Sequence, residues 1–123
     1  MAILESALYS ALSGDAAIAA VVGSGIYPVI IPQDAAFPAI TYTRISGGQQ
    51  NDLTGYEGTE NPRMQIDVWG KTYAAVKDLA AKVRAAMNAA ITFSAIQISD
   101  QDLYEDDMKI YRVSMDFSVW FNT

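Results

Sequence analysis

The 123-residue sequence contains no cysteine and no histidine. Without cysteine there are no disulfides or thiolate metal sites, and without histidine there are no Ser-His or Cys-His nucleophile systems. No apolar run approaches the roughly 20 residues of a membrane span, so we expect no membrane partner. The N-terminal MAILESALYSAL lacks a basic start and a small-residue cleavage site, which favours a mature helix over a signal peptide. We therefore expect neither enzymatic activity nor a cofactor.

Positive charge is also scarce, since eight Lys and Arg residues stand against fourteen acids and give a net charge of −6. A surface that holds nucleic acid needs Lys and Arg to displace counterions from phosphates. The chain is therefore not expected to bind DNA, and its charge is modest for a protein that mimics DNA. The length and the 51% apolar content predict one globular domain over residues 1–123.

Hydrophobic spacing of three to four residues predicts three helices. Two of them, at 4–12 and 16–22, are separated by Gly14 and Asp15, and form a helical hairpin. The third runs from Tyr73 to about Ala90 and carries its Lys and Arg side chains on the side that should face water.

Alternation of apolar and polar residues predicts strands at 63–69 and 111–121, with the last one central to the sheet. The segments 38–46 and 92–99 are further strands, whereas the two prolines in 26–32 confine any strand there to an edge. The expected fold class is α+β. It has a four- to five-stranded mixed, mostly antiparallel sheet with helices packed mainly on one face and a helical hairpin at the N-terminus.

The densest charge is DQDLYEDD, residues 100–107, which holds five of the fourteen acids. An EF-hand loop needs glycine at its sixth position, where this segment has Glu105, so the match fails. A solvated connection between the last two strands is one interpretation. The alternative is a small cation- or ligand-binding module that uses segment 100–107. No catalytic, cofactor-binding or metal-binding residue is otherwise predicted.

The two tryptophans, Trp69 and Trp120, both fall on the polar side of their strands. Tryptophan is rarely left in water, so the second face of the sheet should be covered. Either the N-terminal hairpin or the proline segment covers it within the same chain, or Trp69 and Trp120 belong to a subunit interface.

The segment GGQQNDLTGYEGTENP, residues 47–62, is predicted to be a long hairpin loop with almost no side chain to bury. Loops of this length in compact domains are either functional or disordered, and both interpretations stay open. If it is functional, we expect it to become ordered on a partner, with Leu53 and Tyr56 as anchors. The candidate residues of this assembly loop are Gln49, Gln50, Asn51, Asp52, Leu53, Thr54 and Tyr56.

Two stretches are the most specific parts of a resemblance to a known family: LSGDAAIAAVVGSGIYP at 12–28 and QIDVWGKTYAAV at 65–76. Together with the proline-flanked FPAITYTRIS, the polar insertion and the alternating C-terminal strand, they resemble the tail-completion family of long-tailed bacteriophages. Its members are also described as tail-terminator or tail-to-head joining proteins. The resemblance covers essentially the whole chain.

The resemblance implies a structural virion protein without enzymatic activity or cofactor. Six copies would form a ring at the head-proximal end of the tail tube, ending tube growth and contacting the tail tube protein and a head connector or head-completion protein. DNA would pass through this ring without specific binding. The implied location is the neck region of the virion tail, and the host cytoplasm during assembly. The resemblance assigns no functional side chain to a position of this sequence. The same fold also serves in domesticated phage-like particles, which is an alternative setting.

Overall fold

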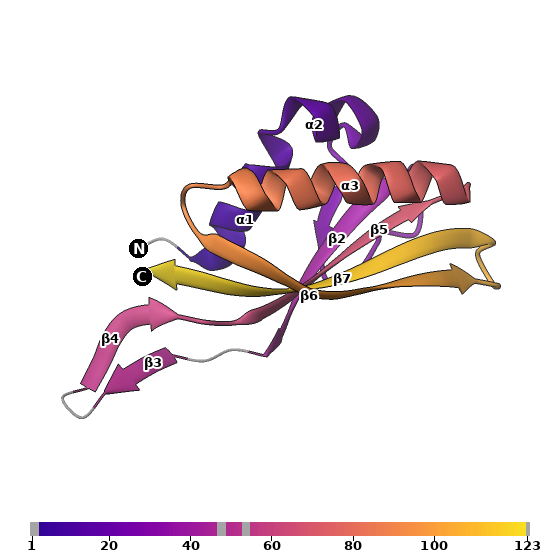
Figure 1. The fold of residues 1–123 in the computed structure, drawn as a ribbon. Coiled ribbons are helices and arrows are strands. Elements are labelled where there is room, and N and C mark those ends of the chain that lie inside the picture. The colour runs from indigo at the N-terminus through magenta and orange to yellow at the C-terminus, as the bar shows by residue number, and fades with distance from the viewer. Residues whose placement is uncertain (1–2, 47–48, 53–54, 123) are drawn as a thin grey trace.

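The computed structural model describes the backbone of residues 3–46, 49–52 and 55–122. Within these ranges all helices lie on one face of a mixed sheet, and the other face carries no helix (Figure 1). The α+β fold class predicted from the sequence is confirmed. None of the helices in the described ranges is long and apolar enough to cross a membrane.

The helices are α1 (Leu4–Ser13), α2 (Ala16–Val22) and α3 (Tyr73–Ala89). Side chains cap two of them at the N-terminus, because Asp15 accepts the backbone N–H of Ile18 at 3.1 Å and Thr72 accepts that of Ala75 at 3.2 Å. Gly23, with a φ of 59°, ends α2 in the left-handed region that glycine adopts without strain. The predicted helical hairpin at the N-terminus is therefore present.

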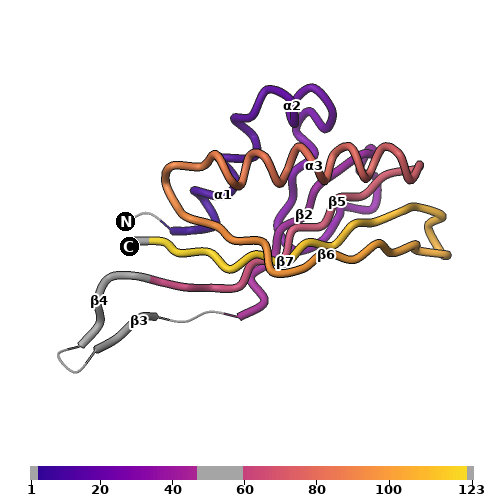
Figure 2. The backbone as a smooth tube through the Cα atoms, viewed as in Figure 1, coloured from indigo at the N-terminus to yellow at the C-terminus, as the bar shows by residue number. Residues whose placement is uncertain are grey.

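The strands are β1 (Ile26–Pro28), β2 (Ala39–Ser46), β3 (Gln49–Asp52), β4 (Gly55–Glu60), β5 (Arg63–Gly70), β6 (Ser94–Glu105) and β7 (Ile110–Asn122). Their order is β1-β2-β5-β7-β4-β3, and β6 pairs with the opposite side of β7. Among the described pairs β1–β2 is parallel and the rest are antiparallel. Figure 2 shows β6 and β7 side by side along the outer part of the sheet. The prediction that the last strand is central is confirmed.

The segment predicted as a loop at 47–62 contains two strands instead, β3 and β4. β4 pairs with β7 through Thr59↔Asn122 and Glu60↔Phe121, in the same register as Arg63↔Ser118 of β5. The side-chain amide of Asn61 donates to Ser118 Oγ and to the Val119 carbonyl, both at 3.0 Å, where β4 meets β5. The sequence suggested a loop because the segment is polar, but a ladder is made by backbone groups and needs no apolar side chains.

The strand predicted at 92–99 is longer than expected, because β6 continues to Glu105. Asp100, Asp102 and Glu105 therefore lie in a strand, and the connection to β7 consists of residues 106–109. The interpretation of 100–107 as a connection between strands is wrong for these three acids, although Asp100 and Asp102 are exposed to solvent as it expected.

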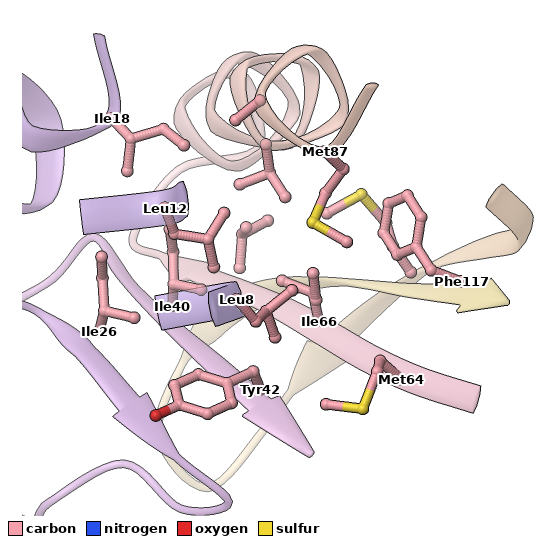
Figure 3. Packing of buried hydrophobic residues seen from close by; sticks show 14 of the residues in the cluster. Leu8, Leu12, Ile18, Ile26, Ile40, Tyr42, Met64, Ile66, Met87 and Phe117 are labelled. Atoms are coloured by element: carbon pink, nitrogen blue, oxygen red, sulfur yellow. The ribbon is translucent and has the colours of Figure 1, made fainter. Parts of the chain in front are cut away.

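The core lies between the helices and one face of the sheet (Figure 3). Leu8 and Leu12 of α1, Met87 of α3 and Phe117 of β7 point into the same space and are at most 1% exposed. Burying each such side chain contributes about 1.5–3 kcal/mol before entropy is counted. The members of this core that are fully buried include Leu4, Ile18, Ile40, Met64, Ile66, Val76, Leu79, Val83, Met115 and Val119.

Candidate functional site on the open face of the sheet

The face of the sheet away from the helices is called the open face here. Side chains alternate between the two faces of a strand, so the set that does not enter the core lies on the open face. From the two central strands this set is Arg63, Gln65, Asp67, Trp69, Arg112, Ser114, Asp116, Ser118 and Trp120.

One end of the open face is a polar network around Asp67. Asp67 accepts hydrogen bonds from Arg112 at 3.0 Å and from the amide of Gln65 at 3.0 and 3.1 Å. Arg112 also lies 2.8 Å from Glu105 and places its guanidinium carbon 4.9 Å from the centre of the Trp69 ring. The arrangement binds three strands together and leaves no described buried side-chain polar atom without a partner.

The other end of the open face is apolar and exposed. Trp120 is 41% exposed and Ile96 63%, and these two residues form what we call the apolar end. Trp120 pairs with Ser94 and Ile96 pairs with Ser118, so Trp120 and Ile96 are diagonal neighbours on adjacent strands. A contiguous group of exposed tryptophan and isoleucine is typical of a protein–protein interface.

The two tryptophans have different environments. The N-terminal hairpin does not cover them, because Leu4, Leu8, Leu12 and Ile18 pack into the core on the opposite face. Trp69 is partly buried and its indole N–H donates to Thr41 Oγ1 at 3.0 Å, so it is engaged within the chain. Trp120 is the more exposed of the two. A subunit interface at Trp69 and Trp120 stays a prediction, with Trp120 better placed for it.

The acids of β6 have cationic partners, although Asp100 and Asp102 stay exposed to solvent. Lys77 of α3 lies 3.1 Å from Asp102, and Arg84 of α3 lies 3.5 Å from Asp100. Hydrogen bonds from the Tyr73 hydroxyl at 2.7 Å and from Lys77 lower the pKa of Asp102. Lys77 and Arg84 on the basic side of α3 are partly exposed, as expected, and they also reach the acids of β6.

These ion pairs also bear on the alternative of a cation-binding module. The described ranges contain no group of three or more acidic side chains placed to hold a metal ion. Asp100, Asp102 and Glu105 already have cationic partners in the same chain. No structural observation favours a cation site at 100–107.

A second cluster ties α1 to the strands. Arg44 of β2 donates to Glu5 of α1 at 2.8 and 3.2 Å, and to Glu60 of β4 at 3.1 Å. Burial, the largest single influence, would raise the pKa of Glu5, but the hydrogen bonds and charge of Arg44 and a backbone hydrogen bond together hold it below its ordinary value. Sequence reasoning missed this cluster, because its members are 39 and 16 residues apart.

Most candidate residues of the assembly loop lie in β3 and β4. Gln49, Gln50, Asn51 and Asp52 form β3, and Tyr56 belongs to β4, where it pairs with Asn51. Leu53 and Thr54 lie outside the described residues. The assembly role of these residues stays a prediction.

Taken together, the helices, the sheet and its open face define a small α+β fold with an exposed apolar end. The chain belongs to the tail completion protein gp17 family, whose sequence model matches residues 6–122. It is therefore a structural tail protein, as the resemblance predicted.

Two solved structures are similar to the chain. One is a chain of the virion of a native gene transfer agent particle, with a TM-score of 0.79, 21% sequence identity, and coverage of 98% of this chain and 95% of that one. The other is a protein of Akkermansia muciniphila solved without its transmembrane region. Its TM-score is 0.38 at 11% identity, with coverage of 66% and 44%, so it supports no conclusion. The first likeness shows the fold. No curated protein sequence matches the chain.

Proposed function

We propose that the protein forms a ring, of six copies, at the head-proximal end of the tail tube. There it ends tube growth and joins the tail to the head connector or head-completion protein. The observation that carries the proposal is the family match over residues 6–122. The similar chain in a gene transfer agent virion supports a place in a particle of this kind. The protein would act in the neck of the virion tail after synthesis in the host cytoplasm.

The described surfaces are compatible with this role. A closed ring needs a heterologous interface, in which one patch of a subunit meets a different patch of its neighbour. The apolar end, with Trp120 and Ile96, can provide one such patch. We propose that the hairpin of β3 and β4, which holds the assembly-loop candidates Gln49, Gln50, Asn51, Asp52 and Tyr56, contacts the tail tube or the adjacent subunit.

Electron microscopy of particles made without this protein tests the proposal. If it ends tube growth, we expect headless tails of abnormal length, because nothing stops addition of tube subunits. If it only joins tail to head, unattached tails of normal length should appear. Supplying the wild-type chain from a second gene should restore joined particles. Tails of normal length attached to heads in its absence would contradict both roles.

A further inference from the structure

Strand β6 is an open edge of the sheet. It is 12 residues long and, within the described ranges, pairs only with β7, so its outer backbone N–H and C=O groups face away from the sheet. The edge at β1 is different, because β1 has three residues and ends at Pro28, which has no N–H to donate. Natural proteins usually protect long edges with charge, proline or bulges, so an unprotected stretch requires an explanation.

Only the second half of β6 is protected. Asp100, Asp102 and Glu105 place charge there, and a bulge separates it from the first half between Gln97 and Ser99. The first half, Ser94–Ile98, has the sequence SAIQI, with no charge and no proline. It also contributes the exposed Ile96 to the apolar end. This half has the features of a strand that accepts another strand.

We propose that Ser94–Ile98 pairs with β3 of a second copy of this chain, so that one sheet continues from subunit to subunit. The inference rests on the proposed ring and names its interface. β3 is the terminal strand on the other side of the sheet and also pairs on one side only in the described ranges. Each copy therefore offers two different edges, as a heterologous interface requires.

Strand directions support this pairing. β6 is antiparallel to β7, β7 to β4, and β4 to β3, so β6 and β3 run in opposite directions within one copy. A second copy related by rotation about an axis along the strands places its β3 beside β6 in the antiparallel sense. The alternation of directions then continues across the interface without a break.

The lengths and charges of the two edges also match. β3 has four residues, Gln49–Asp52, and the regularly paired part of the first half of β6 is also four residues long, Ser94–Gln97, because the bulge follows it. Antiparallel pairing of these segments sets Gln50 opposite Ile96. It also places Asp52 at the Ser94 end, away from Asp100, so like charges are not opposed.

Disulfide cross-linking tests this pairing cleanly, because the chain has no cysteine. Under mild oxidation, the full-length double variant Gln50→Cys with Ile96→Cys should give a ladder of covalent oligomers on a non-reducing gel. On the same gel, an equimolar mixture of the two single variants should give covalent dimers and no larger species. Each single variant alone should run as a monomer.

Two results would overturn the inference. One is the absence of a ladder in the double variant, whether the protein sediments as a monomer or as a ring. The other is a covalent dimer of the Ile96→Cys variant alone, which would show β6 pairing with itself. A ring that forms without cross-links would contradict this interface but not the proposed function. A cross-linked ring that fails to restore joined particles in the electron microscopy assay would support the interface and contradict the function.

A lysine on the edge provides an independent measurement. Ile96→Lys should weaken self-association at least tenfold in sedimentation velocity, because an edge charge must be desolvated when a strand is added. The matched control is Ile91→Lys, which makes the same change at a residue that is 97% exposed and outside the strands. Equal effects of the two variants would count against the edge.

Discussion

Asp67 is a nearly buried acid, 5% exposed, on a face of the sheet that no described helix covers. Its carboxylate accepts three hydrogen bonds, from Gln65 and Arg112, and so compensates for the loss of water around the charge. The network also gives Trp69 a partner within the chain, since Arg112 lies over its ring.

We predict that Asp67→Ala lowers the free energy of unfolding by about 1–3 kcal/mol, because Gln65 and Arg112 lose their shared acceptor. Arg112 keeps its pair with Glu105, so the loss should stay below that of an isolated buried charge. Urea unfolding of the purified variant measures the change.

The control for this prediction is Asp116→Ala on the adjacent strand of the same face. Asp116 pairs with Arg63, whose side chain is 45% exposed, and such pairs contribute at most about 1 kcal/mol. Equal losses for Asp67→Ala and Asp116→Ala would show that the buried network has no special weight.

At the scale of elements, Arg44 connects three pieces of the fold, since it joins α1 through Glu5 and β4 through Glu60. The lowered pKa of Glu5 makes this connection sensitive to acid. Its stabilisation is fully present above the ordinary glutamate pKa of about 4.3 and is lost as the pH falls through the lower native value.

We therefore predict that Glu5→Gln flattens the fall of stability with pH below about pH 4.3, relative to the wild type. Both side chains are about one-third exposed, so the difference should stay below about 1 kcal/mol. Urea midpoints at pH 7 and pH 3 measure it. Asp78→Asn, whose side chain is 67% exposed in its pair with Lys82, is the control and should leave the slope nearly unchanged.

The sequence predicted elements well where the local pattern decides the structure. The bounds of α2 were predicted without error, and α3 ends one residue before its predicted end, because apolar spacing and the caps at Asp15 and Thr72 are local signals. The second half of β6 was missed, because its acids look solvated until α3 and β7 supply Lys77, Arg84 and Arg112 from far along the chain. β3 and β4 were missed for a related reason, since their backbone ladder leaves no apolar pattern.

The surfaces were harder to predict than the elements. Alternation placed Trp69 and Trp120 on the second face correctly, because the period of a strand fixes which side each residue takes. Alternation could not predict that their environments differ. Trp69 contacts Thr41 and Arg112 on neighbouring strands, whereas Trp120 is more exposed. The open edge of β6 depends on the strand order, which no single segment encodes.

At the scale of the whole molecule, most cationic side chains are already paired with acids of the same chain. Six of the eight Lys and Arg residues form ion pairs with acids of the same chain. Binding to DNA releases counterions only when cations are free to contact phosphates. In the proposed ring, the net acidic charge of the chain would therefore weaken contact with DNA that passes through it.

We predict that the purified protein does not bind a labelled 20-base-pair duplex in fluorescence anisotropy at 50 mM salt, up to about 100 μM protein. Non-specific DNA-binding proteins reach dissociation constants of roughly 10⁻⁴ to 10⁻⁶ M even at physiological salt. A known DNA-binding protein serves as the positive control. Binding that weakens steeply as salt is raised would contradict the prediction and point to a basic surface formed by assembly.

The pairing of β4 with β7 has a practical consequence for handling the protein. The partners of Thr59 and Glu60 are Asn122 and Phe121, so β4 pairs with the last two residues of β7. A purification tag fused after Thr123 would therefore lie near the hairpin of β3 and β4. Such a tag would interfere with tests of assembly at this hairpin. Tags for the experiments above belong at the other terminus, with a cleavable linker.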